Sequence, residues 1–177
     1  MAKKYQANDR PVPGYQLLKF LGRGGFGQVW AATGPGGVKV AIKIIDMEGG
    51  EGLKEFRGIR LLKNIHHPNL APIIGVWLRD ESGDVIEEDP MSMDATESIN
   101  IRSLRASEMI LAMGLGDKNL LDLLRDYEAK GQKGIPVNEL LDYMEGAGRA
   151  IDFLNSPRHD LGSGPVAIQH GDIKPQN

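Results

Sequence analysis

Two short stretches in the first quarter of the chain decide the fold: LGRGGFGQV at residues 21–29 and VAIK at residues 40–43. The first contains the pattern G-x-G-x-x-G, whose glycines let the backbone approach phosphate groups and offer them its N–H groups. A dinucleotide-binding loop of this pattern opens a helix at its third glycine, and Asp46 has the acidic offset such a site needs. Residues 28–33 instead continue as a β-rich run and turn back at residues 34–37. The stretch therefore favours a strand–loop–strand hairpin that covers a nucleotide, with a glycine-rich turn without a ligand as the alternative.

A lysine interrupts the apolar strand predicted over residues 38–45. The aliphatic stem of Lys43 can be buried while its ammonium group reaches the space beside the glycine loop, where it would meet phosphate oxygens. Lys39, on the same strand, fits the polar face of an edge strand and is expected to be an ordinary surface residue. The combination of Lys43 with the glycine loop favours a phosphate-binding role.

The remaining pattern predicts strands first and helices afterwards. Strands are expected at residues 15–21, 28–33, 38–45, 70–78 and 108–113, and helices at residues 119–130 and 138–154. Apolar residues recurring every three positions predict a further helix that ends before Pro68, with one face made by Leu53, Phe56, Ile59, Leu62 and Ile65. This order predicts an α+β fold with a small β-rich lobe and a helical one.

Composition excludes several classes of function. The chain has 177 residues, of which 41% are hydrophobic and 25% charged, and its net charge of -3 gives no basic field for nucleic acid. It contains no cysteine, which excludes disulfides and thiolate chemistry and is compatible with a cytoplasmic location. Neither a signal peptide nor a membrane-spanning run is expected.

A third stretch, HGDIKPQN at residues 170–177, completes a recognisable set. In order, the three stretches resemble the protein kinase motifs L-G-x-G-x-F-G-x-V, V-A-I-K and H-R-D-L-K-P-x-N. The resemblance covers residues 15–177, and Lys174 makes it closest to serine/threonine kinases. It implies a kinase-like α+β fold, with a five-stranded antiparallel sheet and one helix followed by the first helices of a larger lobe.

The resemblance also implies an activity and its residues. The expected reaction is transfer of the γ-phosphoryl group of ATP, with Mg²⁺, to a serine or threonine hydroxyl of a protein substrate. Asp172 would accept the hydroxyl proton, Lys174 would contact the transferring phosphate, Asn177 would hold a metal ion and Lys43 would bind phosphate. The residues expected to contact ATP are Leu21, Gly22, Gly24, Gly25, Gly27, Val29, Ala41, Lys43, Met113, Leu115 and Asp117. For Asp117, which would reach the ribose, the alternative is a helix N-cap.

Three features depart from the family pattern. Gly171 stands where most kinases have arginine, which puts control by a phosphorylated activation loop in doubt. The helix position expected to pair with Lys43 is Gly58, so Glu55, one turn earlier, is the substitute candidate, with a solvated surface charge as the alternative. The sequence ends at Asn177 without an Asp-Phe-Gly motif, so this chain is expected to be an incomplete and inactive domain. A nucleotide-binding pseudokinase or scaffold, or an inactive fragment, is the alternative to a kinase.

The domain boundaries follow from the same resemblance. A polar leader is expected at residues 1–14, becoming ordered only near Tyr15, and the incomplete kinase domain at residues 15–177. Within it, residues 15–110 would form the ATP-binding lobe, residues 111–115 the hinge and residues 116–177 the partial helical lobe. Residues 79–107 form an acidic insertion, expected to be solvated, with docking or regulation as the alternative.

Overall fold

The fold was analysed in a computed structural model, which describes residues 4–25, 27–47, 50–62, 64–86, 105–160 and 164–176. The chain divides into two compact units. Unit 1 comprises Met1–Asn64 and Pro72–Leu115, and unit 2 comprises Ile65–Ala71 and Gly116–Asn177.

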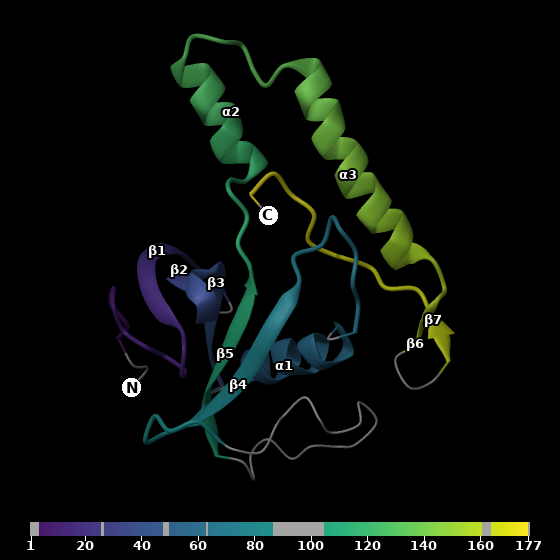
Figure 1. Ribbon diagram of the computed structural model, residues 1–177. Coiled ribbons are helices and arrows are strands. Elements are labelled where there is room, and N and C mark those ends of the chain that lie inside the picture. Colours follow the sequence, from purple (N-terminus) through teal and green to yellow (C-terminus); the bar gives the residue numbers. More distant parts are fainter. Residues whose placement is uncertain are drawn as a thin grey trace. The chain divides into compact units, whose positions relative to one another are not determined.

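Unit 1 is built on a five-stranded antiparallel sheet, as the sequence predicted (Figure 1). Its strands lie in the order β1-β2-β3-β5-β4, so the first three form a meander and β5 separates β3 from β4. The bounds are β1 Gln16–Gly24, β2 Gly27–Thr33, β3 Lys39–Asp46, β4 Ile73–Asp80 and β5 Ala106–Gly114. A 3₁₀ turn, η1 at Pro35–Gly37, joins β2 to β3.

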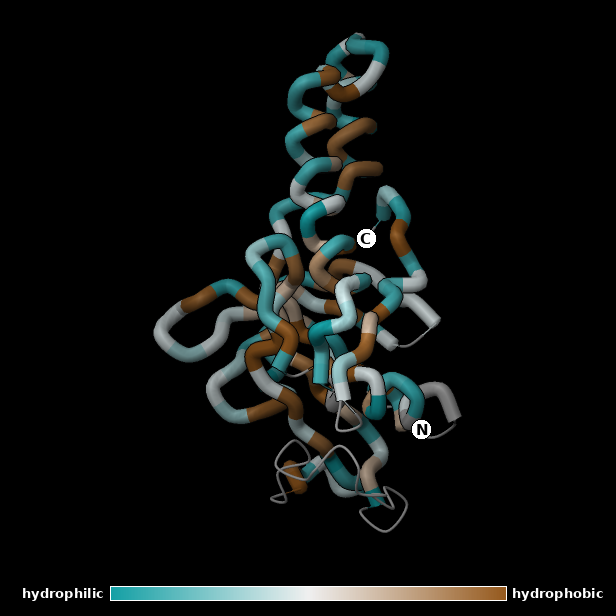
Figure 2. The backbone as a smooth tube through the Cα atoms, turned by 90° about the vertical axis from the view of Figure 1, so that its right-hand side faces the viewer, coloured by the Kyte–Doolittle hydropathy of each residue, from teal (hydrophilic) through white to brown (hydrophobic). Residues whose placement is uncertain are grey.

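Alternation along the strands gives the sheet two apolar faces, because successive side chains of a strand point to opposite sides. On β3, Val40, Ile42 and Ile44 belong to one core cluster, and Ile45 belongs to the other. The first cluster includes Trp30, and the second includes Phe56 of the helix α1, Gly50–Leu62. Figure 2 shows the backbone coloured by hydropathy, with hydrophobic residues in brown and hydrophilic residues in teal.

Helix α1 confirms the predicted apolar face but not its bounds. Phe56 is fully buried and Ile59 is 6% exposed, and both pack in the second cluster. The helix begins at Gly50, three residues before the first residue of the predicted face, and ends at Leu62, so Ile65 lies outside it. The side chains of Leu53 and Leu61 fall outside the described part of the chain.

The segment predicted to be a polar leader is part of the core. Tyr5 is 6% exposed and Val12 is 2% exposed, and both pack against the strands in the first cluster. The Asn8 amide donates to the Leu17 carbonyl, and the Leu17 amide donates to the Asp9 carbonyl, at 2.8 and 2.9 Å. The expectation that order begins only near Tyr15 is therefore wrong, because two large apolar side chains in a polar segment suffice to dock it.

The ends of the expected acidic insertion, residues 79–107, are also ordered. Strand β4 continues to Asp80 and β5 begins at Ala106, and Arg79 is 5% exposed rather than solvated. Residues 87–104 lie outside the described residues. Strand β5 continues through Gly114, so most of the segment expected as a hinge at residues 111–115 is strand, and the division between the units falls after Leu115.

Unit 2 contains the two predicted helices, α2 Leu120–Ala129 and α3 Val137–Asn155. A short hairpin follows them, made by β6 His159–Asp160 and β7 Pro165–Val166. His159 is buried, and a nitrogen of its ring lies 2.8 Å from the Phe153 carbonyl oxygen. Among the described residues, no helix has the length and apolar character required to cross a membrane.

Candidate functional site

Strand register places several predicted site residues of unit 1 on one face of the sheet. Val29 lies opposite Lys43, and Ala41 lies opposite Met113. Directly opposed residues share a face, as do residues two apart along one strand, so these four side chains lie on the same side as Ile45. This is the face on which α1 packs. Leu111, directly opposite Lys43, belongs to this face as well, although the motifs did not indicate it.

The glycine loop forms the hairpin between β1 and β2. Gly24 pairs with Gly27, and Gly22 pairs with Val29 after a register shift that follows Phe20. Because Gly27 opens a strand rather than a helix, the dinucleotide-binding alternative is excluded. Phe26, at the tip of the loop, lies outside the described residues.

The four glycines of the loop fall into two groups. A Cβ atom added at Gly22, Gly24 or Gly25 would meet no other described residue within 4 Å, sequence neighbours aside. Packing against the described residues therefore does not require glycine at these three positions, and these residues leave the backbone there open to a ligand. Gly27 has a φ of 130°, and a Cβ atom there would overlap the carbonyl oxygen of Ile44. Gly27 is required by the protein itself.

Lys43 and Glu55 form an ion pair within unit 1. The Lys43 Nζ atom lies 2.5 Å from the Glu55 Oε1 atom, and the side chains are 20% and 23% exposed. Helix α1 presents Glu55 to the sheet next to Phe56, which anchors the helix in the core. Glu55 is therefore not an isolated surface charge, and it makes the contact for which Gly58 has no side chain.

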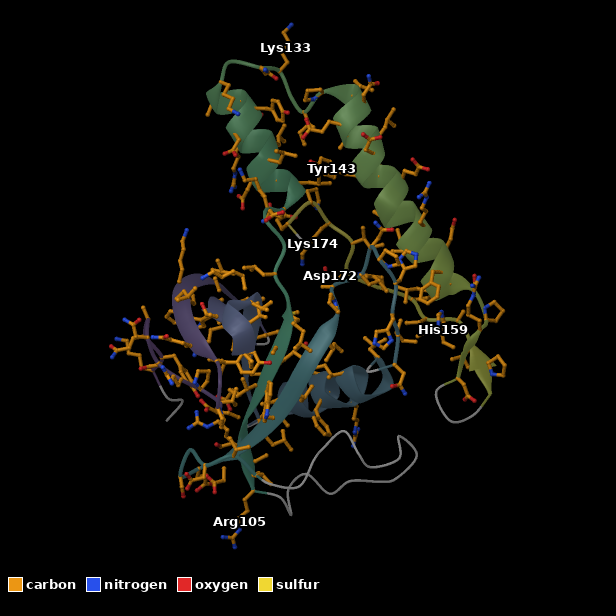
Figure 3. All side chains as sticks on the ribbon, in the orientation of Figure 1. Arg105, Lys133, Tyr143, His159, Asp172 and Lys174 are labelled. Atoms are coloured by element: carbon orange, nitrogen blue, oxygen red, sulfur yellow. The ribbon has the colours of Figure 1, made fainter. Side chains whose placement is uncertain are left out.

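The predicted catalytic residues of unit 2 lie on the segment after β7 (Figure 3). The Lys174 Nζ atom donates to both carboxylate oxygens of Asp172, at 2.8 and 2.9 Å. The Asp172 amide donates to the His170 Nδ1 atom at 3.3 Å, across Gly171, whose φ is 74°. Both charged side chains are about half exposed, at 62% and 47% for Asp172 and Lys174, so this ion pair contributes little to stability.

Backbone hydrogen bonds hold this segment against both helices of unit 2. The Ile168 amide donates to the Leu154 carbonyl of α3 at 2.8 Å, and the Leu121 amide of α2 donates to the Pro175 carbonyl at 2.9 Å. Asp172 lies between these two attachments. The structure thus fixes the backbone around an exposed carboxylate, an arrangement suited to a group that must meet a partner from solution.

Asp117 does not cap α2, which answers one alternative left open by the sequence. The N-cap residue is Asn119, whose Oδ1 atom accepts the Asp122 amide at 2.8 Å. The Asn119 amide group also donates to the Asp122 carboxylate at 3.0 Å. Asp117 is exposed and lies before the helix, so helix capping does not explain an aspartate at this position.

The capping assignment makes a testable prediction. Asn119→Ala should lower the free energy of unfolding by about 1 kcal/mol, because it leaves an amide of the first turn of α2 without its acceptor. Asp117→Ala is the matched control and should leave stability unchanged. Urea denaturation followed by circular dichroism measures both; an equal loss for the two variants would mean that the cap is wrongly assigned.

The predicted site residues thus form two groups, one in each unit. Unit 1 contains the glycine loop, Lys43 with Glu55, and the exposed Leu21 and partly exposed Leu115. Unit 2 contains Asp117, Asp172 and Lys174. Asn177, the predicted metal ligand, lies outside the described residues. Among the residues that the structure does describe, no three histidine or acidic side chains are grouped as a metal site.

Comparison with known proteins identifies a relationship along most of the chain. A model of the protein tyrosine and serine/threonine kinase family matches residues 15–159. Two similar proteins of Arabidopsis thaliana are cysteine-rich receptor-like protein kinase 5, 36% identical over 75 residues, and the G-type lectin S-receptor-like serine/threonine-protein kinase SD1-1, 32% identical over 75 residues. Each match covers 42% of this chain but only 11% and 9% of the respective relative, so this chain spans a small part of their length. The family match, together with the sheet, the glycine hairpin and the Lys43–Glu55 pair, shows that this chain belongs to the protein tyrosine and serine/threonine kinase family.

Proposed function

We propose that this chain provides the ATP-binding and catalytic-loop portion of a serine/threonine protein kinase. The observation that supports it most is the Lys43–Glu55 ion pair on the sheet face that also presents Val29, Ala41 and Met113. An ammonium group held by a carboxylate at a half-buried position is fixed in place for a phosphate group. The glycines at positions 22, 24 and 25 also support the proposal. Contacts with the described residues do not require glycine there, whereas the close approach of phosphate groups to the backbone would.

In this proposal each unit has a separate task. In unit 1, the backbone of the glycine loop and Lys43 bind the phosphates of ATP, and the apolar side chains of the sheet face contact the adenine. In unit 2, Asp172 orients the serine or threonine hydroxyl and accepts its proton, and Lys174 neutralises charge on the transferring group. Mg²⁺ would neutralise the phosphates, and the amide oxygen of Asn177 is the ligand that this chain would offer it.

The alternative function is a nucleotide-binding pseudokinase or scaffold. Gly58 and Gly171 favoured it, because each lacks a side chain that typical family members use. Glu55 pairs with Lys43 in place of the side chain that is missing at Gly58, and this pairing weakens the pseudokinase alternative. Gly171 still distinguishes this protein from most kinases, which have arginine at this position. If the protein therefore requires no phosphorylated activation loop, phosphatase treatment should leave its activity nearly unchanged.

The decisive experiment measures binding and transfer separately. A protein that carries the complete kinase domain should bind Mg·ATP in calorimetric titrations and transfer labelled phosphate to serine or threonine of a basic protein substrate. Asp172→Asn should keep ATP binding and lose transfer. Product containing only phosphotyrosine would contradict the proposed residue specificity. Binding without transfer by the complete, unsubstituted domain would support the pseudokinase, and absence of ATP binding would refute both functions.

A further inference from the structure

The N-terminal segment of unit 1, residues 4–14, forms a strap across the face of the sheet opposite α1. Val12 and Tyr5 are buried at 2% and 6% exposure in the cluster that includes Trp30 and Ile42. The Gln6 amide donates to the Asp9 carboxylate at 2.9 Å, which folds the strap locally. The structure therefore has two layers on the sheet, with α1 on one face and the strap on the other.

The strap ends in a polar cluster defined by Tyr5, Arg79 of β4 and Glu108 of β5. The Tyr5 hydroxyl donates to the Glu108 Oε2 atom at 2.6 Å and accepts from the Arg79 Nη1 atom at 2.5 Å. The Arg79 guanidinium also faces Glu108 at 3.4 Å, and its Nε atom donates to the Gly83 carbonyl at 2.8 Å. The side chains of Arg79 and Glu108 are only 6% and 12% exposed.

The surroundings of the Tyr5 hydroxyl favour its protonated form. Burial, followed by the hydrogen bond and the charge of Glu108, raises the pKa of the Tyr5 hydroxyl. The hydroxyl therefore stays protonated near neutral pH and remains a donor to Glu108. Removing it would leave two nearly buried charged groups without one of their shared partners, which is costlier than losing an exposed hydrogen bond.

The cluster lies at the end of the sheet where β3 leads into α1. Glu108 is directly opposite Asp46 in the register of β3 and β5, and the Met47 amide donates to the Ser107 carbonyl at 2.9 Å. The Ser107 hydroxyl in turn donates to the Asp80 carbonyl of β4 at 2.7 Å. The backbone at Asp46 and Met47 is thus held by the residues that flank the cluster.

The first turn of α1 packs directly on that backbone. A Cβ atom added at Gly52 would overlap the carbonyl oxygen of Asp46 and come within 3.0 Å of the Met47 Cα atom. Met47 is 8% exposed and belongs to the same cluster as Phe56. Glu55 lies one residue before Phe56, so the contacts that seat α1 also position the carboxylate that binds Lys43.

We propose that the strap is a positioning element of the ATP-binding unit, and that Tyr5 acts through Glu108 and the end of β3, at Asp46 and Met47, on the Lys43–Glu55 ion pair. The coupling is a contiguous series of contacts from Tyr5 to Glu108, then to Asp46 and Met47, then to Gly52 and α1. The effect on catalysis rests on the function proposed above, whereas the effect on α1 does not depend on it.

Amide hydrogen exchange of the chain without nucleotide tests the proposal. Tyr5→Phe should accelerate exchange in α1, residues 50–62, by about tenfold or more, because a hydrogen bond to a charged group is lost at the end of the sheet on which the first turn of α1 packs. Exchange in β1 and β2 should change less. The control is Val12→Ala, which removes strap packing without touching the polar cluster, and should not single out α1. If the two variants give the same exchange pattern, the strap is only a structural cover and the proposal is overturned.

A double-mutant cycle then tests the connection to the ion pair. Tyr5→Phe should weaken ATP binding in the unmodified protein and have no further effect in the Glu55→Gln background, where the ion pair is already absent. Equal effects in both backgrounds would overturn the proposed path through Glu55. If the unmodified protein binds no ATP, the proposed function fails, and the exchange result alone decides the role of the strap.

Discussion

In a protein that carries the complete kinase domain, replacing Lys43 with methionine is expected to lower phosphoryl transfer by a factor of about 10²–10³ or more. Methionine keeps an unbranched stem that can occupy the same partly buried position, but it removes the ammonium group that Glu55 holds at 2.5 Å. The Lys43 ammonium group is proposed to bind the phosphates and to stabilise the negative charge that develops on them during transfer. Rates measured with labelled ATP, with ATP affinity determined in parallel, check this expectation.

The chain offers a matched control for this variant. Lys39 lies on the same strand and the same face four residues earlier, and its Nζ atom donates to the Thr33 hydroxyl at 3.2 Å, at an exposed position. Lys39→Met therefore changes the same charge on the same strand and should retain nearly full activity. If Lys43→Met keeps the rate of the unmodified protein, Lys43 is not the phosphate-binding residue, and the assignment of the sheet face as the nucleotide site is wrong.

The sequence predicted those parts of the fold that depend on local residue patterns. Strand alternation and glycine turns placed all five strands, and three-residue apolar spacing placed α1, because these signals depend on neighbours in sequence. Element ends were less well predicted: α1 starts at Gly50, and its first turn approaches Asp46 and Met47 closely at Gly52, a contact that no local pattern shows.

Long-range contacts explain the rest of what the sequence could not show. Tyr5 lies 103 residues from Glu108, and a polar segment with one tyrosine and one valine reads as a leader unless the sheet that receives it is known. The pairing of Lys43 with Glu55 was indicated as a candidate from helical spacing, but only the three-dimensional approach of α1 to β3 distinguishes it from a surface charge. The short β6–β7 hairpin has too few residues to leave a pattern.

Replacing Gly27 with alanine should destabilise unit 1 by about 2–5 kcal/mol, the largest stability effect expected from a single added methyl group in the loop. Two causes add. The φ of 130° is a conformation that L residues rarely adopt, and the added Cβ atom would overlap the Ile44 carbonyl oxygen and lie 3.0 Å from its carbonyl carbon. The two Ile44 atoms belong to the backbone of β3, so no side-chain rotation relieves the overlap. The pairing of β2 with β3 must shift instead.

Gly25→Ala separates this structural requirement from a requirement for ligand. Its sequence neighbours aside, the added methyl group at residue 25 meets no described residue within 4 Å, so stability should change by no more than about 0.5 kcal/mol. Its ATP affinity should nevertheless fall, because the methyl group occupies space that the phosphates are proposed to use. Thermal unfolding and calorimetric titration of the two variants measure the two effects independently. Gly27→Ala with unchanged stability would show that the hairpin does not bring Gly27 against Ile44, and Gly25→Ala with unchanged affinity would place the phosphates elsewhere.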